Sequence, residues 1–459
     1  MAPLSRYAVT WLTQEQPGGV AVTGPTRAYV RAYDAAGKPV TPPIFLTPTT
    51  PGPLLSPSTA GSTPKVAIRD SGEFVVVFDE IVYAPQSELA HHIYVQRFAA
   101  NGTTLGGRSF VDIGENPDIA LTTTGFLVSY VRYISGRAFV RVQRFDANGG
   151  TVGGPIAIDN YPSNNLAYIG STHIRTRCTD EFIVLYHDTR SGFGTTSQPL
   201  THIIRFSAAG TQMGSRITLN DEEPSGAFGD RAPGNARLVY LPTGAFNAIT
   251  TTGGNHFLHR FDANGNPAAT PEFLFGSIEP PSMAANSCGD VMLAWRPVGT
   301  DQVRVREYSY AGVPVAESSF NQTPLGAPAS PRGVAVSVGS ALFATAWTRD
   351  VVGGLQDTMH RRWILDSSLH SGSNVRVCRY GCGGADPCQP AAFIGPPSVP
   401  GYTYQWSPAT YLSNPNVARP TVKHPGGNKS FEVTYTVTID GQCCKRQQQV
   451  TVRFDVGCF

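Results

Sequence analysis

The chain has 459 residues, of which 41% are hydrophobic and 15% charged, and its formal net charge is +2. This balance gives no electrostatic reason to expect a nucleic acid or an anionic membrane as partner. We find no run of about 18 apolar residues, so the sequence predicts no transmembrane helix. The 48 glycines and 37 prolines punctuate short hydrophobic runs, a composition typical of turn-rich all-β proteins. A strand-like pattern begins directly after residues 1–5, without a recognisable signal peptide, and we expect a mature or trimmed form.

One short phrase recurs seven times in the first 370 residues: an Arg or Gln-Arg, an aromatic residue, three small or polar residues and a Gly. The seventh copy has lost its Gly. The aromatic positions are Tyr33, Phe98, Phe145, Phe206, Phe261, Tyr308 and Trp363. Self-similarity at this spacing is typical of repeat architectures.

Each copy belongs to a unit of four predicted strands. In the second unit these strands cover residues 65–68, 73–78, 93–98 and 108–112. The second strand of most units is apolar on both sides, as expected for a strand packed between two sheets. Seven such units predict a seven-bladed β-propeller over residues 1–377, in which stacked blades cover one another's faces.

The repeated phrase has a structural interpretation. Asp-Ala-Asn-Gly is the expected hairpin turn between the third and fourth strands, because Asn tolerates and Gly favours positive φ. We expect the aromatic residue to pack between blades. The repeated arginines occupy one structural position, which favours a structural role over a ligand site.

Two features break the repeat. The first unit has no convincing first strand, and residues 389–395 are a possible source of a strand that completes it. Long inserts, where we expect binding surfaces to develop, cover residues 42–64, 161–173, 189–199 and 220–234.

From residue 378 the composition changes. Residues 401–413 favour a strand followed by a turn, and residues 431–439 and 447–454 alternate with period two. We predict a small Ig-like β-sandwich over residues 378–459.

Six of the eight cysteines lie in this segment: Cys378, Cys382, Cys388, Cys443, Cys444 and Cys458. An even number in a short module favours a disulfide framework, whose pairing stays open, over a zinc site. Cys178 and Cys288 precede equivalent strands of the fourth and sixth units, and we expect them to be free buried thiols.

The repeat resembles the tandem phrases of secreted and surface-exposed bacterial proteins that fold as propellers. Residues 404–416, with Trp406-Ser407-Pro408 and Asn414-Pro415-Asn416 in order, resemble the PKD-like and Ig-like modules of bacterial exoproteins. The Trp-Asp-Phe-Gly-Asp-Gly phrase of typical PKD domains is absent. These resemblances imply an extracellular binding, adhesive or structural role and supply no catalytic residue.

Candidate chemistry is sparse. The turn pairs Asp146/Asn148 and Asp262/Asn264 offer too few carboxylates for calcium, and His91 and His92 should point to opposite faces of a strand. We recognise no sialidase box, Walker motif, nucleophile elbow or dinucleotide fingerprint, and we predict no catalytic residue, cofactor or metal. Exposed residues of the inserts could bind a sugar by stacking and hydrogen bonding: Tyr161, Asn164, Asn165, Phe193 and Phe228.

The sequence therefore favours a secreted or cell-surface binding, adhesive or structural protein of bacterial type. Its expected partner is a protein or a glycan, and the C-terminal sandwich would tether the propeller or mediate assembly into an extracellular polymer. The alternative is a lectin or a carbohydrate-active enzyme, glycosidase or lyase, with its site at the mouth of the propeller. Glu80, Asp188 and Glu222 would supply the carboxylates of such an enzyme.

Overall fold

The computed structural model describes the chain over the following residues: 6–14, 26–34, 36–46, 59–60, 64–82, 90–134, 137–160, 168–189, 200–220, 237–252, 255–276, 281–295, 297, 302–309, 312, 314–321, 334–338, 342–351, 355–364, 375–379, 389–441 and 443–456.

Over these ranges the chain forms strands and no helix, and the first 364 residues make seven successive antiparallel sheets. The first holds β1 (Tyr7–Gln14), β2 (Thr26–Tyr33) and β3 (Ile44–Phe45), and the second holds β4 (Thr59–Ala60), β5 (Lys65–Ile68), β6 (Phe74–Val82), β7 (Ala90–Phe98) and β8 (Ser109–Ile113). The third holds β9 (Glu115–Leu121), β10 (Gly125–Ile134), β11 (Arg137–Asp146) and β12 (Ile156–Asn160), and the fourth β13 (Tyr168–Thr176), β14 (Phe182–Thr189), β15 (Leu200–Phe206) and β16 (Gln212–Asn220). The fifth holds β17 (Leu238–Tyr240), β18 (Phe246–Thr252), β19 (Asn255–Phe261) and β20 (Glu272–Gly276), the sixth β21 (Ser282–Ala285), β22 (Val291–Trp295), β23 (Gln302–Tyr308) and β24 (Pro314–Asn321), and the seventh β25 (Val334–Val338), β26 (Leu342–Val351) and β27 (Leu355–Ile364).

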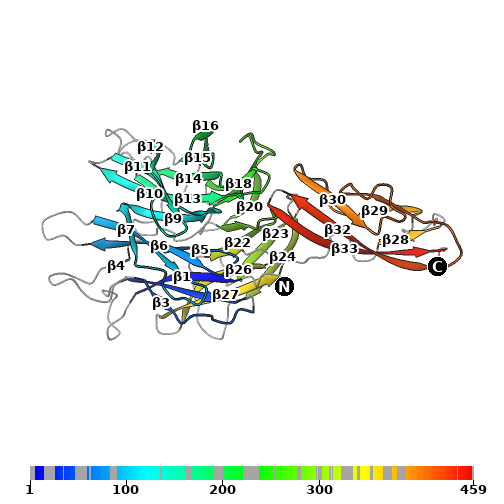
Figure 1. Ribbon diagram of the computed structural model, residues 1–459, viewed down its shortest axis with the longest axis horizontal. Coiled ribbons are helices and arrows are strands. Elements are labelled where there is room, and N and C mark those ends of the chain that lie inside the picture. Colours follow the sequence, from blue (N-terminus) through cyan, green and yellow to red (C-terminus); the bar gives the residue numbers. More distant parts are fainter. Residues whose placement is uncertain are drawn as a thin grey trace.

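The sheets stack through their innermost strands. In chain order, β5, β9, β13, β17, β21 and β25 each contact the next, although none of these strands shares a sheet with its neighbour. Sheets built strand by strand outward from a common centre are the blades of a propeller. The predicted all-β class and propeller fold are therefore confirmed (Figure 1).

The second strand of each blade explains the cohesion of the stack. In β6, Phe74, Val76 and Phe78 belong to a core shared with the first blade. The alternate residues Val75 and Val77 belong to a core shared with the third blade. Because successive side chains of a strand point to opposite faces, one apolar strand joins two cores, as its sequence predicts.

The repeated aromatic residue stacks on the aromatic residue that opens the second strand of its own blade. The ring centroids of Phe74 and Phe98 lie 4.8 Å apart, and those of Phe182 and Phe206 lie 4.9 Å apart. Both rings of each pair then lie in one core between blades. The predicted packing between blades is thus combined with a cross-strand pair that the phrase alone does not reveal.

The glycine of the phrase closes the predicted hairpin turn. Gly149 has a φ of 84°, and its amide donates to the Asp146 carbonyl at 3.1 Å. The Asp146 carboxylate accepts hydrogen bonds from the backbone amides of Asn148 and Gly150, both at 2.8 Å. Asp262 makes the same contacts with its own turn, and these hydrogen bonds lower the pKa of Asp262. The carboxylates thus serve the turn.

The repeated arginine fastens the second, third and fourth blades to the blade that follows each of them. Arg144 donates to the Ala209 carbonyl at 3.0 Å, in the corresponding turn of the following blade. Arg97 donates to the Asn148 carbonyl, and Arg205 to the carbonyls of Ala263 and Asn264. A second set of arginines joins the turns between first and second strands, where Arg69 donates to the Gly125 carbonyl at 2.8 Å.

The expected strand donor of the first blade is wrong. That blade contains three strands among the described residues, but residues 389–395 do not join it. They form β29 (Ala391–Phe393), which pairs with β31 (Thr421–Lys423), and Gln389 bridges to Val377. Their hydrogen bonds are therefore used within the C-terminal part of the chain.

The C-terminal region, residues 375–456, extends from one side of the propeller (Figure 1). One sheet contains β28 (Val375–Cys378), β33 (Cys444–Asp455), β32 (Phe431–Gly441) and β30 (Tyr402–Ser407), and β29 and β31 form a second sheet. Trp406, Tyr435 and Val437 from the first sheet and Val422 from the second belong to a single buried core. The Trp406 indole donates to the Val417 carbonyl at 2.9 Å, which explains why the tryptophan phrase and the segment that follows it occur together.

Candidate functional site

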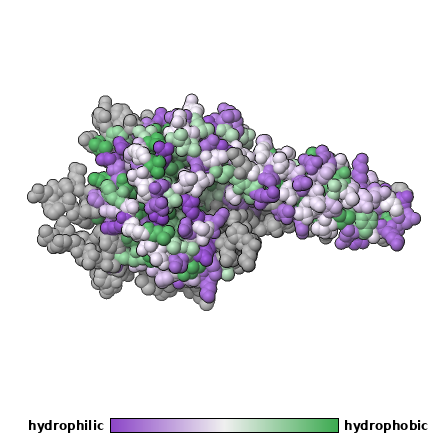
Figure 2. Space-filling model, in the orientation of Figure 1, coloured by the Kyte–Doolittle hydropathy of each residue, from purple (hydrophilic) through white to green (hydrophobic). Residues whose placement is uncertain are grey.

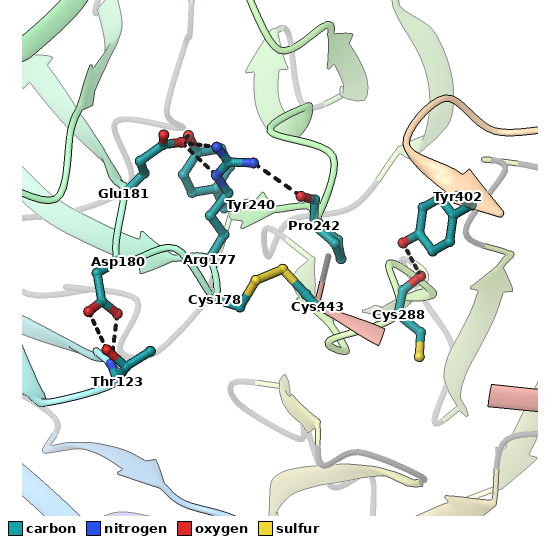
Figure 3. Close-up of a disulfide and its surroundings, with 10 residues drawn as sticks. All are labelled: Thr123, Arg177, Cys178, Asp180, Glu181, Tyr240, Pro242, Cys288, Tyr402 and Cys443. Atoms are coloured by element: carbon teal, nitrogen blue, oxygen red, sulfur yellow. Dashed lines mark hydrogen bonds and ion pairs between the residues drawn. A yellow bond between two sulfur atoms is a disulfide. The ribbon is translucent and has the colours of Figure 1, made fainter. Parts of the chain in front are cut away.

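Two disulfides join the C-terminal region to the propeller. Cys178 is bonded to Cys443 and Cys288 to Cys444, across sequence separations of 265 and 156 residues. Cys443 and Cys444 lie at the tip of the β32–β33 hairpin. Close to this tip, the Tyr402 hydroxyl donates to the Cys288 carbonyl at 3.0 Å (Figure 3).

The expectation that Cys178 and Cys288 are free thiols is wrong. It failed because the sequence separates the two blades from the tip of the hairpin, whereas the fold brings these four cysteines together in pairs. Cys378 is also disulfide-bonded. Cys382, Cys388 and Cys458 lie outside the described residues.

The hairpin tip lies on one face of the propeller. Cys178 and Cys288 occupy the turns between the first and second strands of the fourth and sixth blades. Because successive strands of a blade run antiparallel, the connections between second and third strands must lie on the opposite face. We call this opposite face the free face.

The free face gathers titratable side chains at the ends of second strands and the starts of third strands. His91 Nδ1 lies 2.9 Å from Asp79 Oδ2, and His91 Nε2 lies 3.7 Å from Glu115 Oε1. Asp79 belongs to β6, His91 to β7 and Glu115 to the next blade's β9, so this Asp–His–Glu array bridges two blades. His92 instead contacts the ring of Phe110, as expected for neighbours on opposite faces of a strand.

The carboxylates proposed for an enzyme are engaged within the protein. Glu80 accepts a hydrogen bond from Arg108 at 2.7 Å. Burial raises the pKa of Glu80, with Arg108 opposing and Asp79 adding to the effect. Asp188 Oδ2 lies 3.6 Å from His202 Nε2. Glu80 and Asp188 thus belong to different blades, separated by the third, and both are buried. Glu222 lies outside the described residues.

The predicted sugar-binding residues cannot be placed. Tyr161, Asn164, Asn165, Phe193 and Phe228 all lie outside the described residues.

A cavity of about 360 Å³ lies between the second and third blades. Its lining includes Arg97, Gly106, Gly107, Ser109 and Asn148. The Arg97 guanidinium is committed to the Asn148 carbonyl. The cavity is therefore formed by the parts of the repeat that hold the blades together.

The molecular surface shown in Figure 2 mixes hydrophilic and hydrophobic residues over the propeller, and the C-terminal region is mostly hydrophilic. Large exposed hydrophobic side chains include Phe110 on β8 and Phe273 on β20, the outer strands of separate blades. Isolated residues of this kind are ordinary on protein surfaces. The polar groups of the free face are thus the better candidates for a site.

No family model and no curated protein matches the chain. Among solved structures, it is similar to an α-L-arabinanase of Penicillium chrysogenum complexed with arabinobiose, at 11% identity and a TM-score of 0.40, over 65% of this chain and 92% of that one. It is also similar to the haemagglutinin-neuraminidase ectodomain of parainfluenza virus 5, at 9% identity and a TM-score of 0.39, over 70% and 84% of the two chains. TolB from Acinetobacter baumannii matches at 13% identity and a TM-score of 0.32, over 78% and 80%. Likenesses at this level carry no argument about activity. The resemblance to bacterial secreted repeats and PKD-like modules stays an expectation.

Proposed function

We propose that the protein is a secreted or cell-surface binding protein whose propeller presents its free face to a glycan or protein partner. The observation that carries the proposal is the pair of disulfides from Cys443 and Cys444 to two separate blades. Two anchor points fix the hairpin tip more firmly than a flexible linker would. The C-terminal region therefore acts as a rigid stalk on one face and leaves the other face for a ligand.

The disulfides also support a location outside the cytoplasm. Disulfides persist in oxidising compartments and are rare where thiols are kept reduced. Over the ranges that the structure describes, no helix has the length and hydrophobicity to cross a membrane.

The organisation that we propose is a seven-bladed propeller ending near residue 377, followed by an Ig-like or PKD-like stalk. The stalk tethers the propeller or joins copies into a polymer by strand addition at its sheet edges. Negative-stain imaging of the purified protein tests the second possibility. Filaments would support it, whereas discrete particles under all conditions would reject it.

A carbohydrate-active enzyme is the second candidate, favoured by the Asp79–His91–Glu115 array and by the raised pKa of Glu80. Most glycosidases use two carboxylates in one cleft, about 5 to 10 Å apart. Asp79 and Glu80 are both buried and engaged with His91 and Arg108. This commitment to internal partners makes us favour binding over hydrolysis.

A glycan array combined with a hydrolysis screen separates the two candidates. We expect binding of a glycan subset by the full chain, without release of reducing ends. Turnover that falls at least about a hundredfold in Glu80→Gln, with unchanged folding, would instead establish the enzyme. The absence of both binding and turnover on a broad array would contradict a glycan partner. A protein partner would then be sought by pull-down with the immobilised propeller.

A further inference from the structure

Four titratable residues occupy the same position on the first strands of four successive blades. Lys65 pairs with Val77, Asp118 with Ser129 and His173 with Leu185, each three residues after the aromatic that opens the second strand. Arg237 holds the equivalent place, since its carbonyl accepts from the Ile249 amide at 2.9 Å. These strands contact one another at the centre of the propeller. The four residues and Arg175 form what we call the inner cluster.

The only carboxylate in the inner cluster is already neutralised. Asp118 Oδ2 accepts hydrogen bonds from Arg175 at 2.7 Å and from the Ile174 amide at 3.0 Å. His173 Nδ1 lies 3.9 Å from the same oxygen. Asp118 is therefore hydrogen-bonded to the fourth blade, and the cluster contains no second carboxylate that could pair with Lys65.

The ammonium of Lys65 has no hydrogen bond or ion pair among the residues that the structure describes. Desolvation lowers the pKa of Lys65 to about 8, with Asp118 opposing and Arg175 adding to the effect. Lys65 is half-buried, and a cation that is partly withdrawn from water is stabilised by an anion placed beside it.

His173 is likewise surrounded by positively charged side chains. Burial holds the pKa of His173 well below its ordinary value, and Arg175, Lys65, His187 and Arg237 all add to this effect. Two of these neighbours contact each other, since His187 Nε2 lies 3.4 Å from Arg237, and His187 Nδ1 lies 2.8 Å from the Thr201 hydroxyl. The surroundings of His173 favour a group with negative charge.

We propose that the inner cluster binds a compact tetrahedral oxyanion, a phosphate or a sulfate, held by Lys65 and Arg175 with His173 donating one hydrogen bond. Arginine and lysine are the usual partners of such groups. The oxyanion is either a free ion or the ester group of a modified sugar. This proposal does not depend on the free face being the site of partner binding.

Calorimetric titration of the full chain at constant ionic strength tests the proposal, with sodium chloride as reference. We expect binding of inorganic phosphate or sulfate, or of N-acetylglucosamine 6-sulfate, and binding about tenfold weaker in Lys65→Met. Lys445→Met is the matched control, because Lys445 is an exposed lysine paired with Asp440 on the stalk, and its affinity should equal that of the wild type. A tighter complex with the sulfated sugar than with free sulfate identifies an ester as the source, and the reverse identifies the free ion.

Asp118→Asn gives a readout that loss of folding cannot imitate. Removing the competing carboxylate should tighten oxyanion binding severalfold, while a merely structural cluster would show no gain. The absence of binding to all three probes at 10 mM (about the weakest useful affinity) would overturn the proposal. Equal affinities in Lys65→Met and Lys445→Met would overturn it as well.

Discussion

Replacing Arg205 by Met should loosen the junction between the fourth and fifth blades. Arg205 is 6% exposed and donates to the carbonyls of Ala263 and Asn264 in the next blade. A hydrogen bond from a charged donor contributes about 1.5 to 3 kcal/mol. Because both carbonyls belong to an exposed turn and regain water in the variant, we expect a net loss of about 2 to 3 kcal/mol rather than the full sum.

Equilibrium denaturation monitored by tryptophan fluorescence measures this loss as a shift in midpoint. Arg144→Met is the matched comparison, since Arg144 makes one such contact, to Ala209, at an exposed position. We expect it to lose about 1 kcal/mol. An Arg205→Met variant within about 0.5 kcal/mol of the wild type would refute the interpretation of the repeated arginine as a fastener between blades.

Three further predictions follow from the fold. Phe182→Ala should lower the free energy of unfolding by about 3 to 5 kcal/mol in chemical denaturation, because Phe182 is fully buried against Phe206. Phe273→Ala, on the exposed surface, should change the free energy of unfolding by less than about 0.5 kcal/mol. Equal losses in the two variants would contradict the core assignment. Lys65→Met should be more stable than the wild type at pH 7, since the lowered pKa of Lys65, about 8 against 10.5 when unfolded, is a stability cost fully present below pH 8. That difference should shrink as the pH rises from 8 to 10.5 in parallel denaturation series, and a constant difference would show that Lys65 is not desolvated. The double variant Cys443→Ser/Cys444→Ser should free the stalk, seen as a larger radius of gyration in solution scattering and faster proteolysis near residue 375. Each disulfide alone stabilises the folded state by about 5 kcal/mol, because it restricts the entropy of the unfolded chain. Unchanged scattering would mean that noncovalent contacts suffice to hold the stalk.

Most of the fold is readable from the repeated phrase. The spacing of Phe98, Phe145 and Phe206 predicts blades, and Gly149 predicts the turn, because local geometry alone dictates these residue types. The apolar run from Phe74 to Phe78 likewise predicts a strand with a core on each side, because its successive side chains point to opposite faces and each face must be covered by a neighbouring blade.

The junction between propeller and stalk is not readable in the same way. Cys178 and Cys443 are separated by 265 residues, and nothing in either local sequence specifies the other. Pairing depends on which turns face the hairpin tip, which only the assembled blades determine. The inner cluster escapes prediction for a similar reason, since Lys65, Asp118 and His173 look unrelated until the register places them at one level.

The most direct test of this account is disulfide mapping of the unreduced protein by peptide mass spectrometry. We predict one cross-linked species that contains the peptides of Cys178, Cys288 and the adjacent pair Cys443 and Cys444, with fragmentation assigning Cys178 to Cys443 and Cys288 to Cys444. Recovery of Cys178 and Cys288 as free thiols, with Cys443 and Cys444 bonded inside the stalk, would contradict the covalent attachment on which the proposed function rests.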